Sequence, residues 1–306
     1  MPDISKINAV AIADIEKLDA VLAANIEKVN GLVFSTAPAF VGLLDTYTGA
    51  AAGYSVRRLA TSATNLMRIR EDSGDTETDI GYDSNNELDS AAIATHCGTA
   101  NGYVVTWYDQ AGSNNATQST SGNQPQIYNG TAVTTKNSKP AMQFDGVDDF
   151  VEASVSFSHN GHTYTVGSGE NTGIEFALCM GGPSSERFET VFDQRSSPKR
   201  HTVVFDTSTN YVDLDTQATV GQQYLLNNSN DSGTIRGYVD GVEQSTTITG
   251  FSALSINAIR LARFPGGGGL SNGQVTLQEA IIFNVAGHSN RTGIETDINT
   301  YFSIYT

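Results

Sequence analysis

From about residue 40 to its end, the chain consists of short runs of strand-forming residues separated by residues that favour turns. The runs are rich in Val, Ile, Thr, Tyr and Phe, and Gly, Asn, Asp and Ser stand between them. Because the runs are short and their boundaries are turn formers, the pattern predicts an all-β sandwich. The predicted strands are 103–108, 141–144, 150–157, 174–180, 189–192, 201–205, 211–214, 222–226, 234–239, 256–264 and 275–283.

Local signals place a turn, a loop and a helix within this pattern. Asp240-Gly241 lies between strand-forming residues and predicts a tight hairpin turn. The glycine run 265–269 predicts a loop. Near the C-terminus, Ile294, Ile298 and Phe302 are spaced as one helix face, and Ser289 is placed to cap the helix. This is the one helix that the sequence indicates clearly.

The first 34 residues contain a repeat with a period of 11. Three copies align, and their matching apolar positions are Ile4 and Ile7, Ile15 and Leu18, and Ile26 and Val29. An 11-residue period is compatible with a helix, but the apolar positions spread around the helix instead of forming one stripe. The preferred alternative is a short strand and turn in each copy, as one rung of a solenoid or an intertwined oligomer. Either form is too small to bury its own apolar residues, so we expect these six residues to assemble with partners.

Charge and composition exclude several classes of function. The chain has 33 Asp and Glu against 17 Lys and Arg, a formal net charge of −16, which argues against nucleic acid as a partner. Its apolar runs are too short for a membrane span, and no secretory signal is visible. Cys97 and Cys179 lack metal-ligand spacing, so neither a disulfide scaffold nor a zinc site is expected.

Five stretches in the first half of the chain carry a resemblance to known families. They are 54–59, 69–70, 79–82, the Trp-Tyr-Asp-Gln segment 107–118 and the Phe-Asp-Gly-Val-Asp-Asp segment within 139–151. These stretches resemble the concanavalin A-like (laminin G-like) domains of bacteriophage structural proteins, and they are similar to the catalytic domain of the arabinofuranosidase B family of glycoside hydrolases. The resemblance implies a jelly-roll β-sandwich over 37–306, preceded by an attachment segment over 1–36.

The similarity to arabinofuranosidases implies two catalytic carboxylates. In that family a nucleophilic Glu follows a Phe-Asp pair, and the acid/base Asp precedes Ile-Arg-Gly. Here Phe192-Asp193 is followed by Pro198 at the nucleophile's position, while Asp231 does precede Ile235-Arg236-Gly237. Glu186 or Glu189 could replace the missing nucleophile only if the loop were shifted. A retaining glycosidase needs both carboxylates, so the sequence predicts that the chain is not an enzyme, with Asp231 as its one weak catalytic candidate.

Two further sets of residues are candidates for binding. Tyr103, Trp107 and Tyr108 could form a platform on which a sugar ring stacks, although a lone Trp in a strand is more typical of a core. Asp145, Asp148 and Asp149 offer the oxygen ligands that Ca²⁺ prefers. The same Asp-rich pattern is typical of an ordinary turn. Apart from this possible Ca²⁺, no cofactor is expected.

The sequence therefore predicts a structural protein on the surface of a bacteriophage virion, assembled in the host cytoplasm. Either a head decoration protein or a tail appendage fits, attached through the repeats to other virion proteins and forming a trimer. A host surface glycan is a possible ligand. The alternatives are a glycoside hydrolase related to arabinofuranosidase B and a free carbohydrate-binding module.

Overall fold

The computed structural model describes residues 39–181, 187–195, 212–215, 217–264, 272–285 and 289–306, and the backbone alone of 202–205, 209–211 and six two-residue strands between residues 6 and 33. It divides the chain into two compact units, Met1–Phe40 and Val41–Thr306. The predicted boundary at residue 36 stays a prediction, because residues 34–38 lie outside the described residues.

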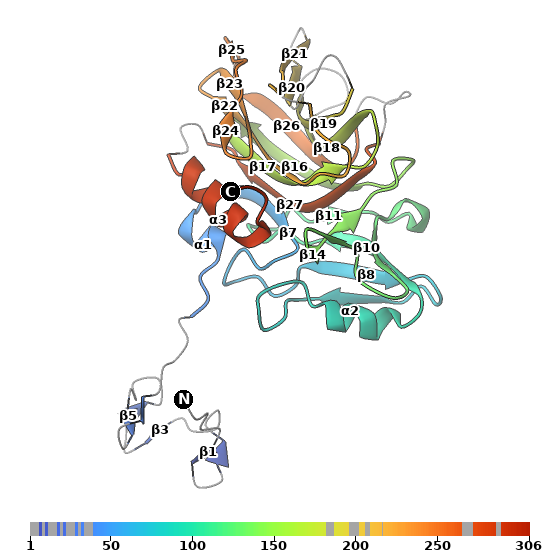
Figure 1. Cartoon of the computed structure of the whole chain (residues 1–306), viewed down its shortest axis with the longest axis vertical. Coiled ribbons are helices and arrows are strands. Elements are labelled where there is room, and N and C mark those ends of the chain that lie inside the picture. The colour runs from blue at the N-terminus through green and yellow to red at the C-terminus, as the bar shows by residue number, and fades with distance from the viewer. Residues whose placement is uncertain are drawn as a thin grey trace. The chain divides into compact units, whose positions relative to one another are not determined.

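The first unit contains one short antiparallel hairpin in each copy of the repeat (Figure 1). Residue Ile7 pairs with Val10, Leu18 with Val21, and Val29 with Leu32. This confirms the strand-and-turn alternative over the helix. The side chains of Ile7, Leu18 and Val29, and the whole of Ile4, Ile15 and Ile26, lie outside the described residues, so the predicted assembly contacts stay a prediction. The six strands are β1 (Lys6–Ile7), β2 (Val10–Ala11), β3 (Lys17–Leu18), β4 (Val21–Leu22), β5 (Lys28–Val29) and β6 (Leu32–Val33).

The second unit is an antiparallel β-sandwich, which confirms the predicted fold class. One sheet is centred on β27, which pairs with β7 on one side and with β17 on the other; β17 then leads through β22 to β23. Its strands are β7 (Ala50–Ser55), β27 (Val275–Phe283), β17 (His162–Gly169), β22 (Tyr224–Asp231) and β23 (Thr234–Val239), with β24 (Val242–Glu243) and β25 (Ile248–Thr249) at the edge.

The other sheet is longer and faces the first. Asn228 of β22 donates a hydrogen bond to Thr190 of the opposite sheet at 2.7 Å, which joins the two layers. In pairing order its strands are β9 (Glu77–Ile80), β8 (Met67–Glu71), β10 (Asn101–Trp107), β11 (Ala116–Thr117), β16 (Val151–His159), β26 (Leu254–Leu261), β18 (Ile174–Gly181), β19 (Arg187–Asp193), β20 (Thr202–Phe205) and β21 (Thr209–Val212).

Two short strands connect the two sheets through β10 and β27. β12 (Gln126–Asn129) pairs with β10, and β15 (Met142–Gln143) pairs with both β12 and β27. A separate hairpin joins β13 (Thr135–Lys136) to β14 (Lys139–Pro140). This connection brings β8, β10, β12, β15 and β27 into one continuous surface.

The remaining elements are three α-helices and a single turn of 3₁₀-helix among the described residues. They are α1 (Leu43–Thr46), α2 (Ser90–Cys97), α3 (Arg291–Phe302) and the turn Ser121–Asn123. The predicted C-terminal helix is confirmed, and it buries Ile294, Ile298 and Phe302. The prediction that Ser289 caps this helix is wrong. Asn290 occupies the N-cap position, and its side chain makes no capping hydrogen bond. No helix of the described residues is long and apolar enough to cross a membrane.

Sequence patterns located several elements and missed others. The predicted turn is confirmed, since Asp240 and Gly241 both have positive φ (51° and 80°), as a tight hairpin turn requires. Helix α2 was not predicted; it begins where Asp89 accepts a hydrogen bond from the amide of Ala92. Strand β17 was also missed. Both Cys97 and Cys179 are buried free thiols. The predicted loop 265–269 lies outside the described residues.

Helix α3 is held to the sheets by a buried arginine. Arg57 follows β7, and its Nε and Nη2 donate to the carboxylate of Glu279 on β27 at 2.8 and 3.2 Å. Its Nη1 donates to Asp297 of α3 at 2.8 Å, and its guanidinium lies 4.9 Å from the centre of the Tyr301 ring. Glu279 has no exposed side-chain surface. The Arg57–Glu279 pair therefore joins β27 to the segment after β7, and Arg57 also holds helix α3 through Asp297.

Replacing Arg57 with Met is expected to lower the free energy of unfolding by about 3 to 5 kcal/mol, because the Glu279 carboxylate remains buried without its partner. Urea denaturation measures the effect. The control is Arg68→Met, which breaks the ion pair between Arg68 and Asp79. Because the Arg68 side chain is 42% exposed, this variant is expected to lower the free energy of unfolding by at most about 1 kcal/mol. Equal losses in the two variants would contradict the central role of Arg57.

A buried histidine makes the stability of the sandwich depend on pH. His159, at the end of β16, has no exposed surface and lies 4.8 Å from the ring of Phe188. Neither ring nitrogen has a hydrogen-bond partner. Burial, with a smaller contribution from His162, lowers the pKa of His159 to about 3. The folded protein therefore holds this ring neutral at a pH where the unfolded chain protonates it.

The pKa of His159 in the folded protein lies below its unfolded value near 6.5. Above pH 6.5 neither state binds the proton, so the free energy of unfolding is at its full value. As the pH falls from 6.5 toward 3, the unfolded chain binds a proton that the folded protein does not, and the free energy of unfolding decreases. Relative to His159→Leu, the wild-type protein is expected to lose about 1 kcal/mol of unfolding free energy per pH unit in that window. Urea titrations between pH 7 and 4 measure the difference. His96→Leu, which removes a partly exposed ring, serves as the control. A pH-independent difference for His159→Leu would contradict this assignment.

Candidate functional site

A polar pocket opens on the surface formed by the strands that connect the two sheets. Its volume is about 610 Å³. Its side chains come from β8, β10, β12, β15, the 3₁₀ turn, and the segments before β16 and β27, so only the folded sheets bring them together. The lining residues are Arg70, Asp72, Tyr103, Ser121, Gly122, Gln124, Gln126, Gln143, Asp145, Asp149 and Gln274.

Arg70 fixes one wall of this pocket. Its Nε donates to Gln124 Oε1 at 2.7 Å, its Nη1 to Asp75 at 2.6 Å, and its Nη2 to the Ser121 carbonyl at 3.2 Å. The guanidinium lies 5.3 Å from the centre of the Tyr103 ring. The arginine thus positions Tyr103 and the 3₁₀ turn, and each of its three nitrogens donates a hydrogen bond within the chain.

The turn 145–149 forms the acidic side of the pocket. Asp145 Oδ1 accepts hydrogen bonds from the amides of Val147, Asp148 and Asp149 at 2.8, 3.3 and 3.4 Å. In return, the Asp145 amide donates to Asp149 Oδ2 at 3.1 Å. Gly146 has a φ of 77°, and a Cβ there would lie 2.7 Å from the Cβ of Gln274. The turn therefore requires glycine and packs directly against the segment before β27.

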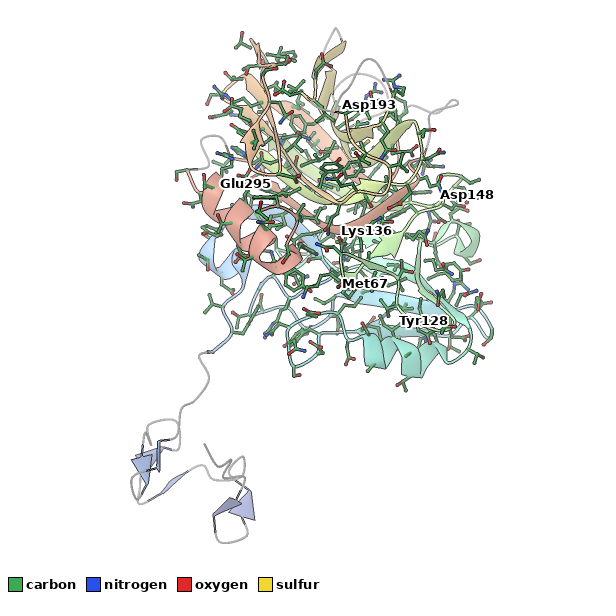
Figure 2. The ribbon with its side chains drawn as sticks, in the orientation of Figure 1. Met67, Tyr128, Lys136, Asp148, Asp193 and Glu295 are labelled. Atoms are coloured by element: carbon green, nitrogen blue, oxygen red, sulfur yellow. The ribbon has the colours of Figure 1, made fainter. Side chains whose placement is uncertain are left out.

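The structure brings the three predicted metal-binding carboxylates together. One oxygen from each of Asp145, Asp148 and Asp149 lies within 4.8 Å of the others. Asp148 lies at the edge of the molecule (Figure 2). Carboxylates at this spacing fit the ligand type that Ca²⁺ takes, but backbone amides already use Asp145 Oδ1 and Asp149 Oδ2. The turn interpretation thus explains the cluster, and Ca²⁺ binding stays a prediction.

Asp149 differs from its neighbours because it is buried. Its side chain lines the pocket, yet the residue is only 7% exposed. Burial, together with the charges of Asp145 and Asp148, raises the pKa of Asp149 to about 7. A carboxyl group that is protonated near neutral pH and faces a pocket can act as a general acid.

The three predicted sugar-stacking residues do not share one surface. Trp107 is fully buried and donates its indole N–H to the Ser55 carbonyl at 3.2 Å, so it belongs to the core. Tyr108 lines a different pocket, where its hydroxyl donates to Asp79. Only Tyr103 lines the polar pocket. A three-ring platform is therefore absent, and a single aromatic ring is available beside the glutamines.

The Trp-Tyr-Asp-Gln segment acts mainly in the fold. It borders the second pocket, of about 500 Å³. Asp109 accepts hydrogen bonds from the amides of Gly53, Ala111 and Asn114. Gln110 accepts from the Leu59 amide at 2.6 Å and donates to the Arg57 carbonyl at 2.9 Å. These polar side chains hold loops together and have little capacity left for a ligand.

The carboxylates suggested by the arabinofuranosidase resemblance lie elsewhere. Asp231 ends β22 at the β22–β23 hairpin. Asp193 is fully buried and pairs with Arg195 at 2.8 Å; Figure 2 marks its position. Glu189, 1% exposed, lies 3.0 Å from Arg187, and burial raises its pKa to about 7. Glu186 and Pro198 lie outside the described residues. The catalytic role of Asp231 stays a prediction.

Comparison with known proteins gives a likeness in structure alone. No protein-family model and no curated protein matches the sequence. The fold is similar to that of a GH54 α-L-arabinofuranosidase soaked with a cyclic sulfate inhibitor (TM-score 0.63, 17% identity, 84% of this chain and 65% of that chain). It is equally similar to an arabinofuranosidase complexed with arabinofuranosyl-α-1,2-xylobiose (TM-score 0.63, 18% identity, 84% and 64%). The chain thus spans about two thirds of the length of these proteins.

These structures correct one expectation from the sequence. The prediction that the chain is not an enzyme is wrong, because the solved structures that its fold resembles are arabinofuranosidases, at a TM-score of 0.63. The missing nucleophile at Pro198 was the basis of that prediction. The sequence predicts Asp145 and Asp149 as metal ligands or turn residues, and it gives no sign that Asp149 is buried in a pocket.

Proposed function

We propose that the chain is a glycoside hydrolase that acts on arabinofuranosides in the polar pocket. The observation that carries the proposal is Asp149, a buried carboxyl group with a pKa of about 7 that lines a pocket of about 610 Å³. The arabinofuranosidase fold supports this reading. A pocket lined by amides, carboxylates and one aromatic ring also suits a polyhydroxylated ligand.

Asp145 is the proposed second carboxylate. Its ligand oxygen and that of Asp149 lie no more than 4.8 Å apart, which favours the closely spaced carboxyl pair of a retaining glycosidase over the wider pair of an inverting one. The backbone amides hold Asp145 Oδ1, which leaves Oδ2 for the substrate. The two groups therefore have the different environments that an acid and a nucleophile need.

In the proposed reaction, Asp149 gives its proton to the glycosidic oxygen while Asp145 Oδ2 bonds to the anomeric carbon. The bond between that carbon and the leaving oxygen breaks, and the leaving group departs as an alcohol. Water then attacks the anomeric carbon, Asp149 takes one proton from it, and the ester to Asp145 breaks. The products are two free hydroxyl compounds, and both carboxyl groups return to their starting states.

Hydrolysis of arabinofuranosyl-α-1,2-xylobiose is expected to fall about 10² to 10⁴-fold in Asp149→Asn, because the leaving sugar needs a proton. The loss is expected to be smaller with 4-nitrophenyl α-L-arabinofuranoside, whose leaving group departs without one. In the wild-type protein, kcat/KM is expected to fall as the pH rises through about 7, where Asp149 loses its proton. Product release measured on both substrates tests all three statements.

Two further variants locate the site. Glu77→Gln removes an exposed carboxylate of β9 that does not line the pocket, and its activity is expected to match the wild type. Asp231→Asn tests the residue singled out by sequence resemblance. If Asp231→Asn abolishes hydrolysis while Asp149→Asn does not, the pocket assignment is wrong. If neither substrate is hydrolysed by the wild-type chain, the proposed function is wrong.

We also propose that residues 1–36 attach the chain to sister chains or to a larger assembly such as a virion surface. The supporting observation is the three repeated hairpins, each of which pairs only two residues with two. Three or more strands with an apolar face are usually needed for independent stability, so isolated hairpins of this size need partners.

Deleting residues 1–36 is expected to convert a trimer into a monomer, because the proposed contacts are in that segment. Light scattering of the full chain and of the deletion variant gives the two masses. The control is the deletion variant's thermal transition, which should stay that of a folded sandwich. An oligomer unchanged by the deletion would show that the repeats do not hold the chains together.

A further inference from the structure

A row of side chains crosses four neighbouring strands at the polar pocket. Arg70 of β8 pairs directly with Tyr103 of β10. Tyr103 in turn pairs with Gln126 of β12, and Gln126 pairs with Gln143 of β15. Directly paired residues of antiparallel strands lie on the same face of a sheet. All four residues line the pocket, so the pocket follows this row from strand to strand.

The length of this row exceeds that of one sugar ring. Neighbouring strands are about 4.8 Å apart, so the three steps from β8 to β15 span about 14 Å. Gln143 in turn pairs with Thr276 of β27, and Gln274, just before that strand, also lines the pocket. The site is therefore an extended groove that crosses the strands.

The glutamines along the groove have free hydrogen-bonding groups. Within the described residues, no hydrogen bond engages the side-chain amides of Gln126, Gln143 or Gln274. Gln124 differs, because it accepts from Arg70 and donates to the Gln118 carbonyl at 2.9 Å. An amide offers both a donor and an acceptor, which matches the hydroxyl groups of a sugar.

The charge of the groove disfavours an acidic ligand. Asp72 and Asp145 line it as carboxylates, and its one cation among the lining residues, Arg70, already pairs with Asp75 at 2.6 Å. A uronate carboxylate would approach these carboxylates without a cation to pair with, and like charges repel.

We propose that this groove binds a neutral oligosaccharide that lies across β8, β10, β12 and β15. Tyr103 stacks on one sugar ring, and the amides of Gln126, Gln143 and Gln274 bind hydroxyl groups of the neighbouring units. The inference rests on the proposed function only for the sugar class, since binding along the groove is separate from cleavage at Asp149.

The test is calorimetric titration of the full chain carrying Asp149→Asn, so that binding is measured without cleavage. The probes are neutral arabino-oligosaccharides of increasing length and an oligogalacturonate of matched length. Affinity is expected to rise with length until the groove is filled and then to level off. The oligogalacturonate is expected to bind about tenfold more weakly at low salt, with the gap narrowing as salt screens the charges.

Variants separate the groove from a general effect on folding. Gln126→Ala and Gln143→Ala are each expected to weaken binding of the longest probe about fivefold, the equivalent of one hydrogen bond, with little effect on the monosaccharide. Tyr103→Phe should keep the affinity that Tyr103→Ala loses. Gln222→Ala, an exposed glutamine elsewhere on the surface, should leave all affinities unchanged.

The outcomes distinguish this inference from the proposed function. Affinity that is the same for every length, or tighter binding of the oligogalacturonate, would overturn the groove even if the wild-type chain hydrolyses arabinofuranosides. Length-dependent binding without hydrolysis by the wild-type chain would support the groove and overturn the enzyme. An effect of Gln222→Ala equal to that of Gln126→Ala would also overturn the assignment of the groove residues.

Discussion

The sandwich depends on one buried charge pair, Arg57 with Glu279. Glu279 lies on β27, the strand that pairs with β7, β15 and β17, and its carboxylate also accepts a hydrogen bond from Ser55 at 2.7 Å. A buried carboxylate is tolerated only when its charge and lone pairs are satisfied. The position of Arg57 between β27 and α3 is therefore dictated by chemistry, and the helix that carries Asp297 must dock where the guanidinium can reach it.

The same strand links this interior to the polar pocket. β27 begins beside Gln274, which meets the turn at Gly146 and lines the groove, and it pairs with β15, which carries Gln143. The shape of the groove is therefore set by strands that are hydrogen-bonded to neighbouring strands. A site on paired strands keeps its side chains in register without needing a ligand to order them.

Three features could be predicted because each depends on residues that are close in the sequence. They are the turn at Asp240-Gly241, the core position of Trp107 and the buried face of α3. Strand β17 was missed because its Gly and Ser residues are poor strand formers, and its two partners, β22 and β27, supply the pairing. The groove could not be predicted at all. Arg70, Tyr103, Gln126 and Gln143 are far apart along the chain, and only the register of four strands aligns them. The burial of Asp149 likewise arises from packing that no local pattern encodes.

The N-terminal hairpins have a modular consequence. Each hairpin is completed within one 11-residue unit, since its two strands are separated by only two residues. The internal pairing of one unit therefore does not depend on how many units precede or follow it. A gene could gain or lose whole units by duplication or deletion and keep every remaining hairpin intact, whereas an insertion of any other length within a hairpin would change its register. The length of this segment can thus change in whole repeat units during evolution without any change in the sequence of the sandwich.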